Sequence, residues 1–246
     1  MTQRLNRILM VAACAVIASL SAANAAQCLD NQALTYYLGL GSTGCTIGDK
    51  IFSDFTYTSS AQGATQVLAS GITVNTLGPA GTGAGTVGQD FPNDIGLQFN
   101  ASWIASGVNT FTDSIIGFTV TVVNGANMLI HDAGLAQLAG ASGTGTASVV
   151  EKGCGPVPCQ LNQWGVMTLD SATTFNSVNG TIFAPVGSVR VQKDISVNSG
   201  TSGFAHLSKV SDTFSQIPEP RAMSILLSLG LLGGLFLRKK LQGVQS

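Results

Sequence analysis

The sequence predicts an all-β protein: an antiparallel, jelly-roll-like β-sandwich with an N-terminal signal peptide and a single C-terminal transmembrane helix. Gly, Ser, Thr, Val and Asn dominate the central part of the 246-residue chain, a composition that favours short strands and turns over helices. Segments in which apolar and polar residues alternate recur along this part. Both ends instead carry a continuous apolar run beside basic residues, which is typical of targeting and membrane segments.

The clearest strand prediction is a β-hairpin. Residues 115–123 alternate between two faces, and Asn124-Gly125 follows them before a second strand over 127–130. Asn-Gly is the strongest two-residue signal for a hairpin turn. Further strands are predicted over 51–58, 69–77, 95–103, 147–151, 164–169, 188–193 and 204–210. The last of these also fits a helix, because its apolar residues recur at helical spacing.

The first 25 residues are predicted to be a signal peptide that leader peptidase removes. Two arginines precede an apolar run over 8–20, and a small-x-small pattern ends at Ala25. Cleavage is expected after Ala25, with Ala26 as the second choice. An alternative is a loose lipobox that would make Cys14 a lipidated N-terminus, although the apolar run continues beyond that residue.

The tail over 217–246 has three parts: a rigid Pro-Glu-Pro segment, an apolar span over 222–237 and a basic end. The span would measure roughly 24 Å as a helix, slightly less than a hydrocarbon core of about 30 Å. Basic residues after the span favour the cytoplasmic side, which places the rest of the chain outside. The residues that define the motif are Pro218, Glu219, Pro220, Arg238, Lys239 and Lys240.

This tail resembles the PEP-CTERM sorting signal in its Pro-Glu-Pro motif, its Gly/Leu-rich span and its basic end. The resemblance implies an exosortase-type membrane enzyme as partner, a transient inner-membrane anchor, and delivery to the cell surface or extracellular matrix of a Gram-negative bacterium. Residues 190–195, 203–208 and 214–216 look like the last strands of such exported proteins, and 45–50 look like their opening. In that family the bodies are treated as non-enzymatic surface or biofilm-matrix proteins. An ordinary single-span anchor is the alternative.

The predicted exported domain over 26–216 is mildly acidic. Residues 26–217 contain five basic residues and eleven acids, a net charge of −6, although the whole chain has a formal charge of −1. So few Lys and Arg argue against nucleic acid as a partner, because nucleic-acid binding needs a basic stripe. About 190 residues are enough for one domain with a sizeable core.

Four cysteines remain after signal cleavage, and an even number in an exported protein predicts disulfides. Three pairings are possible, and distance along the chain favours Cys28 with Cys45 and Cys154 with Cys159. The spacing in the second pair is four residues, not the two of a thioredoxin-like redox site. Neither a metal site nor a cofactor is expected.

Two other functions are compatible with parts of the sequence: a lectin-like module and a secreted hydrolase. A lectin-like module could bind extracellular polysaccharide through the loop at Asp90–Asp94, whose Asp90, Asn93 and Asp94 could also form a calcium loop. Trp103 and Trp164 could be sugar-stacking platforms, although a place in the core is more usual for tryptophan.

A secreted hydrolase could combine His131 or His206 with a serine and an acid, but the sequence has no nucleophile elbow. We therefore expect a non-enzymatic surface or biofilm-matrix protein, with the lectin-like module as the alternative and the hydrolase last.

Overall fold

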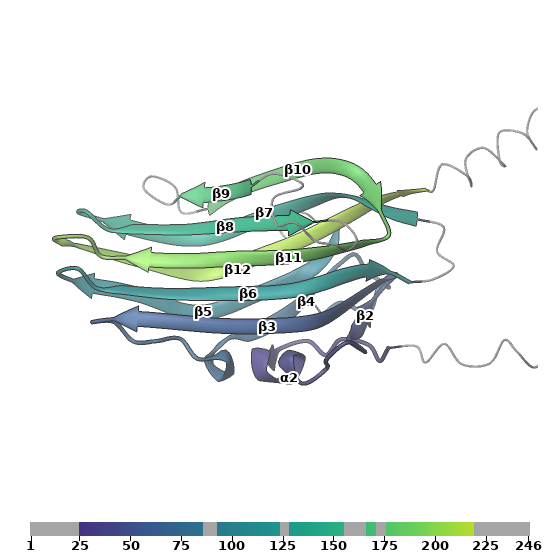
Figure 1. Cartoon of the computed structure of the whole chain (residues 1–246), viewed down its shortest axis with the longest axis horizontal. Helices are drawn as coiled ribbons and strands as arrows, with labels where there is room; N and C mark the ends of the chain where they lie inside the picture. Colours follow the sequence, from purple (N-terminus) through teal and green to yellow (C-terminus); the bar gives the residue numbers. More distant parts are fainter. Residues whose placement is uncertain (1–24, 86–92, 124–127, 155–165, 171–175, 219–246) are drawn as a thin grey trace, which may run out of the picture.

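The computed structural model describes residues 25–85, 93–123, 128–154, 166–170 and 176–218, which form a two-layer β-sandwich (Figure 1). The first sheet has the order β1 (Gln32–Ala33), β4 (Thr73–Leu77), β5 (Ile95–Gly107), β12 (Gly203–Pro218), β7 (Met128–Ser142) and β10 (Asn176–Val186). The second sheet has the order β2 (Cys45–Ile47), β3 (Lys50–Gln62), β6 (Phe111–Val122), β11 (Ser188–Asn198), β8 (Thr146–Cys154) and β9 (Val166–Asp170). Neighbouring strands are antiparallel, so the predicted antiparallel sandwich is confirmed.

The two sheet orders match strand by strand. At each position the facing strands are neighbours in sequence: β5 faces β6, β12 faces β11, β7 faces β8 and β10 faces β9 (Figure 1). The last pair, β11 and β12, is inserted between β5/β6 and β7/β8. This is the strand order of a jelly roll, to which β1 to β4 add two strands at one edge of each sheet.

Most predicted strands are present, with different ends. The segment predicted over 69–77 begins with the short turn η2 (Ala69–Gly71), and only β4 is extended. The ambiguous segment over 204–210 belongs to strand β12, not to a helix. Strands β1, β2 and β10 and the short helix α2 (Leu34–Leu38), which packs beside β3, were not predicted.

The predicted hairpin at Asn124-Gly125 is wrong. Strand β6 pairs with β3 and β11 in the second sheet, whereas β7 pairs with β12 and β10 in the first. Val120 of β6 lies opposite Phe52 of β3 and Val189 of β11, and all three side chains are fully buried. Burial of these long-range partners, not the local turn signal, decides where β6 pairs. The link to β7 therefore crosses between the layers.

The predicted terminal segments lie outside the described residues: the signal peptide, the transmembrane span over 222–237, and the sorting motif beyond Pro218. In the part of the chain that the structure describes, no helix is long and apolar enough to cross a membrane. Strand β12 continues to Pro218, which pairs with Met128 of β7. The sheet thus includes the first two residues of the predicted tail, two residues beyond the predicted domain boundary at 216.

The core lies between the sheets and is built around Phe118. Its ring centroid lies 5.5 to 6.3 Å from those of four other rings, in geometries typical of aromatic clusters. These rings belong to Phe52, Phe55, Phe99 and Phe214. Charged side chains are buried in the same interior, and they are described below.

The Cys28–Cys45 disulfide is confirmed. It attaches the segment before α2 to strand β2, where Cys28 N also donates to Thr46 O at 2.8 Å. Cys154 is buried and disulfide-bonded. Its predicted partner Cys159 lies outside the described residues, so that pairing stays a prediction.

Candidate functional site

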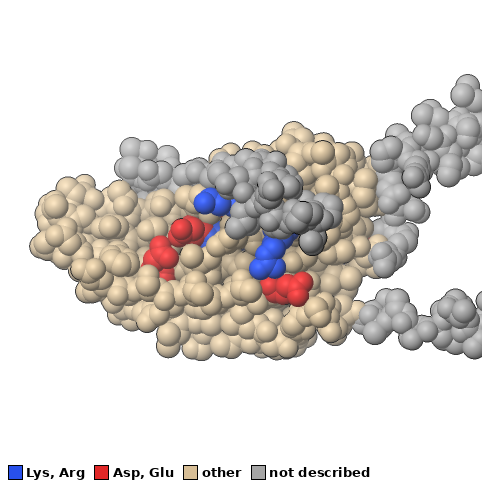
Figure 2. Space-filling view, viewed as in Figure 1, with Lys and Arg blue, Asp and Glu red and all other residues tan. Residues whose placement is uncertain are grey.

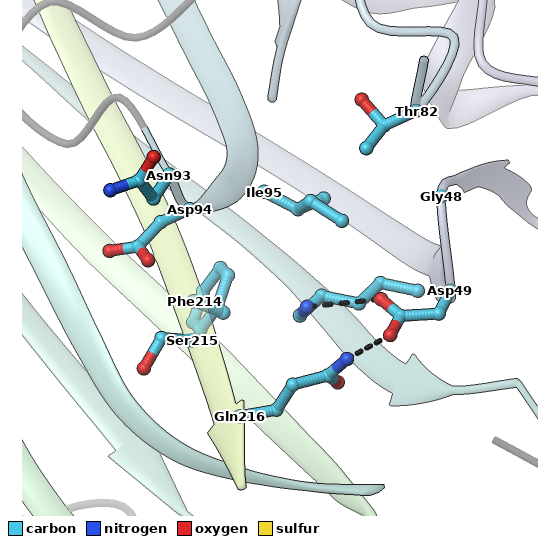
Figure 3. Close-up of a pocket in the computed structure, with 10 residues that line it drawn as sticks. Gly48, Asp49, Thr82, Asn93, Asp94, Ile95, Phe214, Ser215 and Gln216 are labelled. Carbon is cyan, nitrogen blue, oxygen red and sulfur yellow. Dashed lines mark hydrogen bonds and ion pairs between the residues drawn. The ribbon is translucent and has the colours of Figure 1, made fainter. Parts of the chain in front are cut away.

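A pocket of about 380 Å³ opens where strand β12 ends. Four segments line it: the β2–β3 turn, the loop at Thr82, the residues just before β5, and the end of β12. Figure 3 shows the turn and the residues before β5 on opposite sides, with β12 between them. The polar lining residues are Asp49, Lys50, Thr82, Asn93, Asp94, Ser215 and Gln216.

The β2–β3 turn is a two-residue turn at Gly48 and Asp49, because Ile47 pairs with Lys50 across it. Gly48 has a φ of 55°, which favours glycine at the first central position of such a turn. A Cβ at Gly48 would lie 2.7 Å from Ile95 Cδ1, so a larger residue would also collide with the start of β5. Glycine therefore allows the turn to bring the Asp49 carboxylate into the pocket.

Asp49 connects the turn to the last strand. Its carboxylate accepts a hydrogen bond from Lys50 Nζ at 3.2 Å and another from Gln216 Nε2 of β12 (Figure 3). The Asp49 side chain is 33% exposed, whereas that of Lys50 is only 2% exposed. Burial lowers the pKa of Lys50, and the Asp49 carboxylate opposes this shift.

Two further carboxyls act on this pocket. Asp132 of β7 accepts hydrogen bonds from the backbone N–H and the hydroxyl of Ser215. Burial, followed by the charge of Asp132, raises the pKa of Asp94, while Lys50 opposes the rise. Two carboxyls and one ammonium group thus line the pocket, a third carboxyl lies beside it at Ser215, and the hydrogen-bonding groups include donors and acceptors.

The loop predicted at Asp90–Asp94 contributes in part. Asn93 and Asp94 line the pocket, while Asp90 lies outside the described residues. No group of three or more His, Cys, Asp or Glu side chains suited to a metal ion occurs in the described part of the chain. Because Asp90 lies outside the described residues, the calcium alternative stays a prediction.

A histidine, an acid and a serine of the kind that a hydrolase needs do lie close together, but in an unsuitable order. They are His131, Asp132 and Ser215. His131 Nδ1 lies 3.8 Å from Asp132 Oδ2, and the Ser215 hydroxyl donates to the same carboxylate. A triad needs the histidine to accept the proton of the serine hydroxyl, but here the acid occupies that position. His206 lies elsewhere on β12, with its ring 5.5 Å from that of Phe204.

Trp103 lies in the core, the more usual place expected for it, and is not a sugar-stacking platform. Trp103 is fully buried, and its Nε1 donates to Ser114 Oγ at 3.0 Å. It lies at an inward position of β5, where its large apolar surface fills the core. Trp164 lies outside the described residues. Among the aromatic side chains that the structure describes, Phe204 is the most exposed, at 39%.

Five polar residues of the pocket were not predicted as site residues: Asp49, Lys50, Thr82, Ser215 and Gln216. No local pattern marks them, because the pocket forms only when the β2–β3 turn meets the end of β12, more than 160 residues later. The Gly-Asp turn is visible in the sequence, but its distant partner is not.

Charged side chains are sparse on the broad face formed by the second sheet. Figure 2 shows a few acidic and basic groups near the middle of this face and a largely uncharged surface around them. The described residues visible on this face form no continuous basic stripe of the kind that binds nucleic acid.

No protein-family model and no curated protein matches the sequence. Among solved structures, the chain is similar to the carbohydrate-binding module TmCBM61, solved in complex with beta-1,4-galactotriose. The identity is 9%, 66% of this chain and 88% of that chain are covered, and the TM-score is 0.28. A family 11 carbohydrate-binding module from Clostridium thermocellum, in complex with a mixed-linked tetrasaccharide, gives 10% identity, coverage of 69% and 96%, and a TM-score of 0.27.

In larger proteins, this chain is similar to only a part of the structure. For the bacteriophage CBA120 tailspike protein 4, the identity is 13% and the TM-score 0.29, and the match covers 65% of this chain but 19% of the tailspike domain. Likenesses of this size assign neither a family nor a ligand to the chain.

Proposed function

We propose that the protein is an exported, non-enzymatic module that binds an uncharged extracellular polysaccharide in the pocket at the end of β12. The observation that carries the proposal is the pocket itself. Carboxyl, amide, hydroxyl and ammonium groups converge there from four segments, next to the apolar side chains of Ile95 and Phe214. Apolar walls with a few placed polar groups are the usual composition of a small-molecule site.

The polar groups suit hydroxyl-rich ligands. Each sugar hydroxyl can donate to a carboxylate and accept from an amide, and charge-assisted hydrogen bonds are the stronger ones. The site also disfavours anionic polymers, because two carboxyls line it, a third lies beside it, and only one ammonium group opposes them, in a body with a net charge of −6. Uncharged polysaccharides therefore fit better than acidic ones.

The experiment is affinity electrophoresis of the full chain in gels that contain galactan, xylan, mixed-linkage glucan or, as the acidic polymer, alginate. At least one uncharged polymer should retard the parent, and alginate should not. Asp94→Asn should weaken the binding at least about tenfold, which corresponds to about 1.4 kcal/mol. Asp113→Asn is the matched control, because Asp113 is also half-buried but lies on β6, away from the pocket. Loss of binding in Phe204→Ala but not in Asp94→Asn would place the ligand on the first sheet and contradict the pocket.

Export and sorting complete the proposal. A signal peptide, an exosortase-type processing enzyme and a transient membrane anchor agree with the tripartite tail and with disulfide-bonded cysteines. In the sequence, Glu219 directly follows Pro218, the last residue of β12. Glu219→Ala should leave the body exported but accumulate the uncleaved form in the inner membrane. A fractionation blot that shows normal processing of this variant would reduce the tail to an ordinary anchor.

A further inference from the structure

Three ionisable side chains meet inside the sandwich, apart from the pocket. Lys193 of β11 lies opposite Glu151 of β8 in the same sheet, and its Nζ is 3.3 Å from Glu151 Oε2. The same Nζ also donates to Asp212 Oδ2 of β12, in the other sheet. Lys193 and Asp212 are 0% exposed and Glu151 is 2% exposed. The three groups thus join the two layers in a place that solvent does not reach.

Aromatic rings enclose the lysine. Its Nζ lies 4.7 Å from the ring centroid of Phe118 and 5.1 Å from that of Phe99, both of which are fully buried. Among the described residues, no partner donates a hydrogen bond to Asp212 Oδ1. An ionised carboxylate in an apolar interior needs its lone pairs satisfied, so this environment favours the neutral carboxylic acid.

The charge balance of the cluster is unfavourable when every group is ionised. One ammonium and two carboxylates leave a net charge of −1 in the core, and an uncompensated buried charge is strongly destabilising. One additional proton makes the cluster neutral. Burial lowers the pKa of Lys193 to about 8 and raises the pKa of Glu151, although each charge partly offsets the shift of the other. Both pKa shifts favour a neutral Lys193 amine beside a neutral Glu151 carboxylic acid.

We propose that Lys193 and Asp212 condense into an intramolecular amide bond between Nζ and Cγ, and that Glu151 carries the protons of this reaction. A neutral amine is a nucleophile, a protonated carboxyl is an acceptor that can lose water, and the two are held in contact by opposite sheets. The bond would be an autocatalytic modification that ties β11 to β12 through the core.

The step balances without any other reactant. The starting state has a Lys193 ammonium, a Glu151 carboxylate and an Asp212 carboxylic acid. Glu151 takes one proton from Nζ, the free amine attacks Cγ, and Glu151 then moves a second proton from the nitrogen to the departing hydroxyl. The C–O bond breaks and one water leaves. The products are the amide, a protonated Glu151 and water, and the buried site no longer carries a charge.

The test is a peptide map of the full chain, purified from its host, reduced and digested with trypsin. Trypsin cleaves after Arg190 and Lys209, so the bond should join peptide 191–209 to the peptide that begins at Val210. The joined pair should weigh one water less than the two peptides together, and cleavage after Lys193 should be absent. Free Lys193 in the digest, with normal cleavage after it, would overturn the proposal.

Two variants locate the chemistry. Glu151→Gln preserves both reacting groups and the shape of the side chain, and it should give unlinked peptides in a protein whose far-UV circular dichroism matches the parent. A linked map in this variant would overturn the role of Glu151. Lys193→Arg supplies the unlinked reference for the mass analysis. Lys50, which contacts Asp49 in the open pocket, is the internal control, and trypsin should cleave after it.

Discussion

Lys193 and Lys50 are both buried beside carboxylates, but they differ in what surrounds the carboxylates. The partners of Lys193 are sealed between the sheets, whereas Asp49, the partner of Lys50, is one-third exposed at the mouth of a pocket. Strand β12 connects the two sites. Asp212 and Gln216 are four residues apart, about 13 Å along an extended strand.

Phe214 separates the two sites. It is fully buried, packs against the core ring Phe118, and lines the inner part of the pocket. On the pocket side of this ring, water can solvate the charges and a ligand can replace that water. On the core side it cannot, so the charges are unstable unless they are neutralised. Water access therefore distinguishes the two lysines: Lys50 is suited to ligand binding, and Lys193 is suited to the proposed amide bond.

The largest expected effect comes from removing each lysine in turn. Lys193→Met removes the proposed cross-link and leaves two buried carboxyls without a counter-charge, so it should lower the free energy of unfolding by at least about 3–5 kcal/mol. Lys50→Met leaves carboxylates that water still reaches, and its cost should be about 1 kcal/mol or less. Urea unfolding at neutral pH measures both. Equal losses in the two variants would mean that solvent access does not distinguish the sites.

Asp113 extends the comparison to a carboxyl on the outer face of a sheet. Burial, followed by the charge of Asp194, raises its pKa to about 6. Because the folded state binds this proton more tightly than the unfolded state does, protonated Asp113 stabilises the fold at pH values below 3.8, the ordinary pKa. This contribution is lost as the pH rises through about 6. Asp113→Asn should therefore increase the melting temperature at neutral pH and leave it nearly unchanged at about pH 3.5. The same gain at both pH values would show that the charge of Asp113 is not the cause.

Asp94 should show the smallest effect on stability. Its pKa is raised in the same direction, so Asp94→Asn should stabilise the protein slightly at neutral pH, and this gain should disappear in acid. The same variant should bind polysaccharide less well. Thermal unfolding with and without the polymer separates the two effects, and a variant that is less stable at neutral pH would contradict the assigned cause of the shift.

The alternation of apolar residues already contained the signal for the core cluster. In β11, Val191, Lys193 and Ile195 occupy successive inward-facing positions. In β12, Val210, Asp212 and Phe214 do the same. The period of two predicts that both residues face inward, whereas the net charge of −6 counts them without regard to position. A charged residue in the inward phase of a strand is a better indicator of a special site than composition is.

The strand types were predictable because the alternation is local, but strand partners and the pocket were not. Asn124-Gly125 favoured a hairpin, yet β6 pairs with strands whose closest approach in sequence is about 50 residues away. Likewise, Asp49 and Gln216 meet only after both sheets are complete. Local patterns do not encode which of several apolar faces will pack together, and the candidate site depends on that packing.

Amine acetylation of the denatured, reduced protein tests the difference between the two lysines most directly. Unfolding exposes every side chain, so a free lysine reacts wherever it was buried, while an amide nitrogen does not react. We expect complete acetylation of Lys50, Lys152 and Lys209 and none at Lys193, as read by peptide mass mapping. Acetylation of Lys193 to the same extent as Lys50 would contradict it.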